Sequence, residues 1–158
     1  MIKSLQFSDD TCELLLLFQK HKAEYVIAGG EAVIYYGYPR LTGDIDLFFR
    51  NSKENVQKIF DALQEFWGGK IPGIPAPDIL AEPGCVIQFG YPPNRIDLLN
   101  SLSGITYEEA ADGSAFEQIQ YGSETIMLNI ISIKALIKNK KAAGRNKDLD
   151  DIEYLTRK

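Results

Sequence analysis

The stretch VIAGGEAVIYYGYPRLTGDIDLFFR, from Val26 to Arg50, decides the fold. An apolar run ends at two glycines, a segment with helical spacing follows from Glu31 to Tyr38, and DIDLFFR then alternates like a strand. Because strand side chains alternate between faces, Asp44 and Asp46 project together while their apolar neighbours point to the core. Two carboxylates on one face repel each other, so this pair requires a cation, a shared proton or full exposure to water.

The same pattern recurs in RIDLL, where Asp97 lies between apolar neighbours and shares a face with Arg95. Three carboxylates on two strands would form a site for hard divalent cations, which prefer oxygen ligands. His21, the only histidine, lies at the end of the first predicted helix and does not compete. We therefore expect Asp44, Asp46 and Asp97 to bind metal, namely two Mg2+ ions with Mn2+ as an alternative.

Gly29 and Gly30 stand where the first predicted strand turns into a helix. Without a Cβ atom in the way, a polyphosphate would approach the backbone N–H groups closely at this turn. Two metal ions roughly 3.5–4 Å apart activate an attacking oxygen and stabilise a leaving one in phosphoryl transfer. The turn would thus hold phosphates, and the aspartates would hold the metal ions. The competing interpretation is a metal-free protein-binding domain in which the D-x-D motif is a solvated strand edge.

Composition and length fit an ordinary compact domain. The 158 residues are 45% apolar and 25% charged, which suits a single domain. No apolar run reaches the ~20 residues of a membrane span, and the first ten residues lack the layout of a signal peptide. Cys12 and Cys85 lack CxxC spacing, so we expect a cytoplasmic protein with no disulfide scaffold, zinc site or membrane partner. The net charge of −5 argues weakly against a broad nucleic-acid surface.

Apolar periodicity and chain breakers divide the rest of the chain into elements. Ser52 begins an amphipathic helix that ends at Gly68-Gly69, and residues 70–83 are too rich in proline for a regular element. The other predicted elements are a helix from Asp9 or Asp10 to about Lys22, strands in YVIAGG, CVIQFG and RIDLL, a hairpin from Phe116 to Asn129 about YGSE, and two C-terminal helices broken near Gly144. We predict an α/β (α+β) fold with a mixed sheet and flanking helices. Residues 1–130 would form the core, and residues 131–158 would be C-terminal helices packed on the same single domain.

The order GGEAVIYYGYPRLTGDIDLF followed by RIDLL resembles the nucleotidyltransferase superfamily with the polymerase-β-type palm. The closing KKAAGRNKDLDDIEYL is similar to the tail of small bacterial nucleotidyltransferases of the abortive-infection and toxin–antitoxin type. The resemblance implies that Asp44 and Asp46 bind the two metal ions, and that Asp97 ligates one and helps to deprotonate the incoming hydroxyl. It also implies nucleotide binding by Gly29, Gly30, Thr42, Lys140, Lys147 and Asp148.

The C-terminal segment can be interpreted from its spacing alone. An apolar stripe through Ile133, Leu136 and Ile137 continues one turn later with Lys140. Lys140 would therefore face the body of the protein, where it either contacts phosphate or packs its stem while its amino group stays in water. A separate basic row, interpreted as a solvated face or as a nucleic-acid contact, comprises Lys134, Lys138, Lys141 and Arg145.

Several charged residues keep two interpretations. Lys147 can pair with Asp151 one helical turn later, whereas the resemblance places Lys147 and Asp148 in the cleft. Arg40 and Arg95 either offset nearby aspartates or touch substrate. The predicted buried row of the last helix comprises Leu149, Ile152 and Leu155.

The function that these features predict is metal-dependent nucleotidyl transfer. A nucleoside monophosphate would move from an NTP such as ATP to a hydroxyl acceptor, and pyrophosphate would leave. The acceptor would be a tRNA end, a protein or a small molecule, and a toxin-like enzyme would have a cognate antitoxin as its partner. The alternative is a catalytically inactive nucleotide- or partner-binding module with the same fold.

Overall fold

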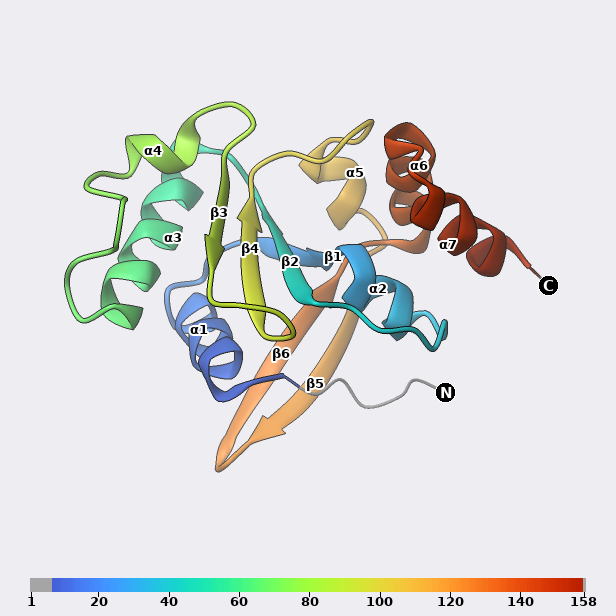
Figure 1. Ribbon diagram of the computed structural model, residues 1–158. Helices are drawn as coiled ribbons and strands as arrows, with labels where there is room; N and C mark the ends of the chain where they lie inside the picture. Colours follow the sequence, from blue (N-terminus) through green and yellow to red (C-terminus); the bar gives the residue numbers. More distant parts are fainter. Residues whose placement is uncertain (1–6, 158) are drawn as a thin grey trace.

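The computed structural model describes residues 7–157, which form the predicted mixed α/β fold (Figure 1). Within these residues, one six-stranded sheet has the order β3-β4-β2-β1-β6-β5 and carries flanking helices. The strands are β1 (Tyr25–Ala28), β2 (Asp44–Phe49), β3 (Val86–Phe89), β4 (Arg95–Leu99), β5 (Ala115–Tyr121) and β6 (Glu124–Ile130). The helices are α1 (Asp9–Lys20), α2 (Gly29–Tyr35), α3 (Lys53–Phe66), α4 (Asp78–Ala81), α5 (Tyr107–Ala111), α6 (Ile133–Ala143) and α7 (Asn146–Thr156).

The pairing of the central strands positions the aspartates. β1 runs antiparallel to β2 and parallel to β6, and β2 runs parallel to β4. This register places Asp46 opposite Ala28 on one side and opposite Asp97 on the other. Because Ala28 is the last residue of β1, the diglycine turn follows directly beside Asp46.

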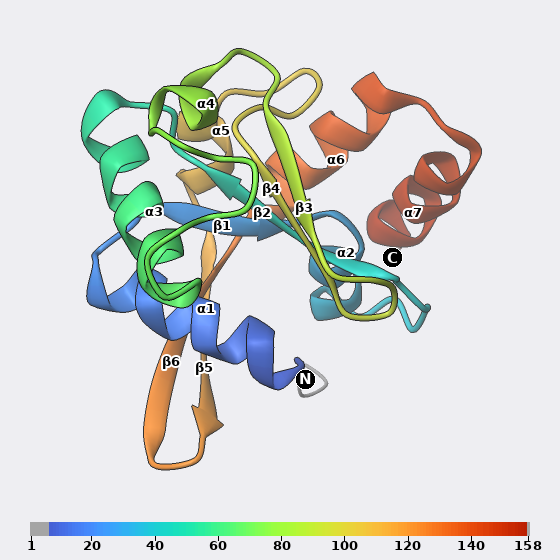
Figure 2. The same cartoon turned by 60° about the vertical axis from the view of Figure 1, so that its left-hand side comes forward.

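Helices pack at two separate places on the sheet. α1 and α3 pack against each other at one end of the molecule, whereas α6 and α7 form a pair at the other (Figures 1 and 2). Phe18 of α1 and Leu63 of α3 are fully buried, and Phe18 packs against Tyr25 of β1 with ring centroids 5.5 Å apart. The second pair lies beside α2 and the strands that carry the aspartates.

Side chains and glycine at the helix ends explain where several helices begin and stop. Ser8, rather than Asp9 or Asp10, caps α1 by accepting a hydrogen bond from the Thr11 amide. Ser52 caps α3 as predicted. α6 ends at Gly144, whose φ of +66° is the left-handed conformation that glycine adopts without a steric penalty. The predicted break between the two C-terminal helices is thus confirmed.

The predicted buried row of α7 is wrong at Leu149, whereas Ile152 and Leu155 are half-buried. Leu149 is 54% exposed, whereas Asp148 and Asp151 are almost completely buried. These acidic groups reach the interior because basic side chains of α6 and of the segment before β2 pair with them. On α6, Leu136 and Lys140 of the predicted stripe are buried as expected, whereas Ile133 at the start of the helix is 41% exposed.

Two short helices correct the sequence-based assignment of loops. α4 lies inside the proline-rich residues 70–83, where we predict no regular element. α5 is not among the predicted elements, and it begins with a capping box in which Thr106 and Glu109 satisfy each other's backbone N–H groups. Among residues 7–157, no helix is both long and apolar enough to cross a membrane.

Candidate metal centre

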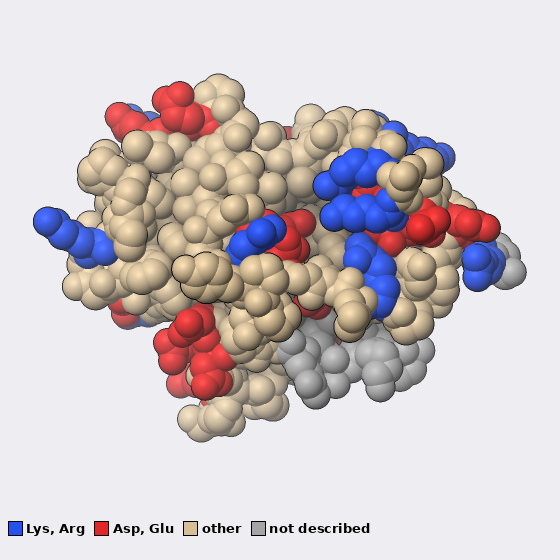
Figure 3. Space-filling view, viewed as in Figure 1, with Lys and Arg blue, Asp and Glu red and all other residues tan. Residues whose placement is uncertain are grey.

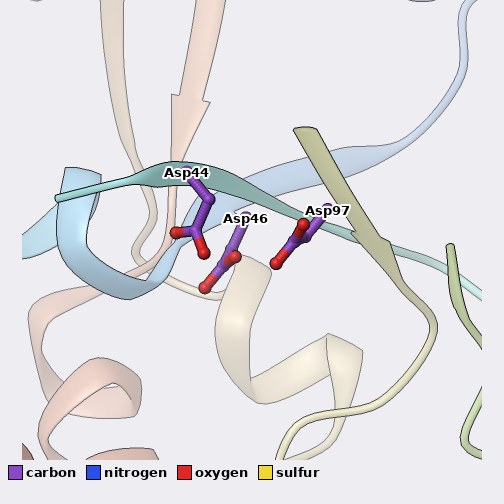
Figure 4. Close-up of side chains that lie close together, drawn as sticks. All are labelled: Asp44, Asp46 and Asp97. Carbon is purple, nitrogen blue, oxygen red and sulfur yellow. The ribbon is translucent and has the colours of Figure 1, made fainter. Parts of the chain in front are cut away.

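Three carboxylates meet where β2 and β4 lie side by side. Asp44 and Asp46 of β2 and Asp97 of β4 each offer an oxygen, and these oxygens lie within 4.8 Å of one another (Figure 4). The convergence follows from the parallel register, which sets Asp46 opposite Asp97 and lets both project from the same face. The predicted cluster is therefore present, and its all-oxygen donor set fits a hard divalent cation.

Arg95 lies directly against this cluster. Its Nη2 donates to Asp44 Oδ2 at 2.6 Å and to Asp97 Oδ2 at 3.1 Å, and its Nε donates to Asp97 Oδ1 at 2.9 Å. The strand pairing explains the contact, because Arg95 is the register partner of Asp44 and lies two residues before Asp97. Of the two interpretations of Arg95, the structure shows the one in which it offsets the aspartates.

Asp46 is the least compensated carboxylate of the three. Burial raises the pKa of Asp46 to about 7, and repulsion by Asp44 and Asp97 acts in the same direction. Lys140 and Arg95 lower this pKa in part. Such a group gains more than an already paired carboxylate from a nearby cation.

The two glycines make room for side chains of the site. Gly29 has a φ of +61°, and a Cβ atom there would lie 2.1 Å from Asp46 Oδ2. A Cβ atom on Gly30 would lie 2.5 Å from Thr42 Oγ1. The Thr42 hydroxyl in turn donates to the Asp44 backbone carbonyl at 3.3 Å. The diglycine thus permits the close packing of α2 on the segment that carries the aspartates.

A cavity of about 550 Å3 opens over the carboxylates. The space-filling view shows an acidic patch near the centre of this face and a basic cluster toward α6 and α7 (Figure 3). The predicted site residues that line the cavity are Gly29, Gly30, Thr42, Asp44, Asp46, Asp97, Lys140 and Lys147. The cavity therefore brings acidic and basic side chains together around one space.

Lys140 belongs to a buried ionic network. Its Nζ lies 3.1 Å from Asp148 Oδ1 and 2.9 Å from Asp151 Oδ2, and its side chain is only 4% exposed. Arg40 pairs with Asp151 at 2.9 Å, and Arg145 pairs with Asp148 at 2.7 Å. The interpretation of Lys140 with its amino group in water is therefore wrong, because the amino group is held between two buried carboxylates.

The network also corrects two predictions about the last helix. Asp148 does not line the cavity, because its carboxylate is fully buried against Lys140 and Arg145. The expected pair between Lys147 and Asp151 is not among the ion pairs of residues 7–157, since Asp151 is taken by Lys140 and Arg40. Lys147 instead lines the cavity.

Some cavity residues escape sequence reasoning. Ser101, Leu102 and Ser103 follow β4 and form part of the wall, and Asn139 of α6 donates to the Ser103 carbonyl at 2.9 Å. The only sequence feature that could have identified them is their position directly after β4. A segment that follows a strand with a site aspartate lies at the same edge of the sheet as that aspartate. Arg145 also lines the cavity, although spacing alone placed it in a basic row with two interpretations.

Fold and site together define a mixed α/β protein with a three-carboxylate candidate metal centre in a cavity of both charge signs. No protein-family model matches the chain, and no curated protein matches it.

Proposed function

We propose that this protein is a metal-dependent nucleotidyltransferase that moves a nucleoside monophosphate from an NTP to a hydroxyl acceptor, with release of pyrophosphate. The observation that carries the proposal is the meeting of Asp44, Asp46 and Asp97 in one cavity with the glycine turn and a basic wall. The order of the motifs along the chain, which resembles the nucleotidyltransferase superfamily, supports the same conclusion.

The carboxylates would hold two divalent cations, Mg2+ or Mn2+. When bound, these cations would supply charge neutralisation at the reacting phosphate and at the leaving pyrophosphate. Asp44, Asp46 and Asp97 would hold these cations in position. Asp97 would also accept the proton of the incoming hydroxyl, the role that the resemblance implies. Most of the catalysis would come from positioning and electrostatic stabilisation rather than from covalent chemistry.

The cavity suits a triphosphate in size and charge. Its volume of about 550 Å3 lies within the roughly 300–1,000 Å3 usual for small-ligand sites. Arg145 and Lys147 offer positive charge on the wall of the same cavity. Gly30 and Thr42 line the side where α2 begins, so they would contact the phosphates.

The acceptor would be an RNA end such as that of tRNA, a protein side chain or a small molecule. Basic side chains beside the cavity favour an anionic acceptor, because they would raise its local concentration by electrostatic attraction. A toxin-like enzyme of this kind would also be controlled by an antitoxin partner.

Calorimetric titration of each of the four NTPs, with and without Mg2+, tests the proposal. We expect Mg2+-dependent binding by the wild type and its loss in Asp44→Asn/Asp46→Asn. The matched control is Asp112→Asn/Asp150→Asn, which removes the same charge from two exposed positions outside the cavity. If the wild type binds an NTP, it is then incubated with labelled NTP and candidate acceptors. Transfer of label to an acceptor identifies an enzyme, whereas binding without transfer identifies an inactive binding module. Equal binding by the wild type and the Asp44→Asn/Asp46→Asn variant would contradict the proposed site.

A further inference from the structure

Arg95 occupies carboxylate lone pairs that a metal ion could also use. Both carboxylate oxygens of Asp97 and one oxygen of Asp44 accept hydrogen bonds from its guanidinium. The geometry toward Asp97 is the parallel two-bond fork that arginine forms with carboxylates, which is stronger than a single contact. A third donor, Gln88 Nε2, lies 3.5 Å from Asp97 Oδ2.

Two of the three carboxylates keep oxygens that Arg95 does not contact. Asp44 accepts through Oδ2 only, so its Oδ1 is free of the guanidinium. Asp46 receives no hydrogen bond from Arg95. A cation can therefore bind to Asp46 and to the free oxygen of Asp44 while Arg95 stays in place, whereas coordination through the Asp97 lone pairs that face Arg95 breaks at least one arginine hydrogen bond.

We propose that Arg95 is a built-in competitor of the metal ion, a positioning residue that holds Asp97 and Asp44 until a divalent cation displaces its guanidinium. The inference rests on the proposed function and adds an order of events to it. Asp46 and Asp44 bind first, and Asp97 joins only after Arg95 leaves. Coordination by all three carboxylates therefore requires a step in which Arg95 competes with the metal ion.

Exposure explains why Arg95, and not Lys140, the other cation that lowers the pKa of Asp46, fills this role. The Arg95 side chain is 30% exposed and lines the cavity, so its guanidinium can turn into open space. Lys140 is 4% exposed and fixed between Asp148 and Asp151, so its ammonium has no comparable freedom. Arginine is also more weakly hydrated than lysine and keeps its charge at every relevant pH.

The test is calorimetric titration of Mn2+ alone into the wild type, Arg95→Met and Arg95→Lys at pH 8.5. Methionine keeps the side-chain length without charge or donors, and lysine keeps the charge without the fork. We expect Arg95→Met to bind Mn2+ about tenfold more tightly than the wild type, a factor within the usual range for coupled sites. Arg95→Lys should lie between the two. Arg50→Met is the matched control, because Arg50 also joins two carboxylates, Glu24 and Glu108, but lies outside the cavity.

NMR of the wild type supplies a second measurement that a merely structural role would not change. The Nε–H signal of Arg95 should shift on addition of Mg2+ as its hydrogen bond to Asp97 breaks, and the Arg50 signal should not. Unchanged Mn2+ affinity in Arg95→Met would overturn the inference while leaving the proposed function in place. If Arg95→Met does not fold, unchanged affinity in Arg95→Lys together with a static Arg95 signal has the same meaning. Absence of Mn2+ binding in the wild type and in the Arg95 variants would overturn both the inference and the proposed function.

Discussion

At the scale of single residues, Gly29 and Gly122 allow a controlled comparison of the same substitution. Both have a φ of +61°, but a Cβ atom would meet the Asp46 carboxylate at Gly29 and nothing within 4 Å at Gly122. We predict that Gly122→Ala costs about 1 kcal/mol of unfolding free energy, which is the strain of a left-handed alanine. Gly29→Ala should cost at least about 2 kcal/mol, because Asp46 must also move, and it should weaken Mn2+ binding. Urea unfolding and metal titration of both variants measure the difference, and equal costs would contradict it.

We predict that the partly buried carboxyl group of Glu31 makes the unfolding free energy depend on pH. Burial raises the pKa of Glu31 to about 7, with Asp44 acting in the same direction and Arg40 against it. Between pH 4.5 and 7 the folded state keeps a proton that the unfolded state has lost, so the Glu31 contribution to stability falls as the pH rises through this window. Glu31→Gln should therefore match the wild type at pH 4 and exceed it by about 1–2 kcal/mol at pH 8, after allowance for solvent screening.

Thermal and urea unfolding at both pH values check the Glu31 prediction. Glu124→Gln, at an exposed position of the β5–β6 hairpin, corrects for the loss of one negative charge. The same gain for Glu31→Gln at pH 4 and pH 8 would show that the buried charge is not its cause.

Residue patterns predicted which carboxylates meet, but not how they are paired. Period-two alternation was sufficient to place Asp44, Asp46 and Asp97 on one face, because strand geometry determines side-chain direction. The contact between Arg95 and two of these carboxylates depends on which strand lies next to β2 and on a side-chain rotamer. The spacing of residues within one segment determines neither the neighbouring strand nor the rotamer, so both interpretations of Arg95 remained open.

At the scale of elements, the buried face of α7 is acidic and depends on α6 for its compensation. We predict that Lys140→Met lowers the unfolding free energy by about 3–5 kcal/mol, because Asp148 and Asp151 would lose a buried partner. Lys138→Met should cost no more than about 1 kcal/mol, since its partner Glu109 and its own side chain are exposed. Urea unfolding measured by circular dichroism compares the two variants, and similar costs would show that the network contributes little.

Most elements were predictable because each one carries its own local signal. Ser52, Gly144 and the turn in YGSE mark helix and hairpin boundaries by chemistry that acts within a few residues. The orientation of α7 was not predictable in this way. Apolar periodicity pointed to Leu149, but Arg40, more than a hundred residues away, pairs with Asp151 and turns the acidic side inward.

At the scale of the whole molecule, the single sheet predicts one cooperative unfolding transition. Trp67 contacts Phe66 and Phe89, with ring centroids 5.5 Å and 5.4 Å away, so its fluorescence reports the packing of the end of α3 near β3. Far-UV circular dichroism reports all elements together. We expect the two urea transitions to share one midpoint, because all six strands belong to one sheet. Separate midpoints would show more than one unfolding unit and would contradict the prediction.

The order of the strands could not be deduced from the sequence. The pairing of β1 with β6 joins Ile27 to Ile130, whose separation along the chain exceeds the reach of any local pattern. Such contacts depend on the closure of a long loop, and many topologies share the same local signals. The prediction of a mixed sheet was confirmed, whereas its order became known only from the structure.

The buried network around Lys140 has a consequence during synthesis of the protein. β2 and β4 leave the ribosome early, yet the cation between Asp148 and Asp151 and the basic wall of the cavity belong to residues made much later. A nascent chain that ends before residue 148 carries the three strand aspartates without the ion pairs that position α7. We therefore expect the complete cavity, with both its acidic and its basic side chains in place, to form only after translation has passed this helix.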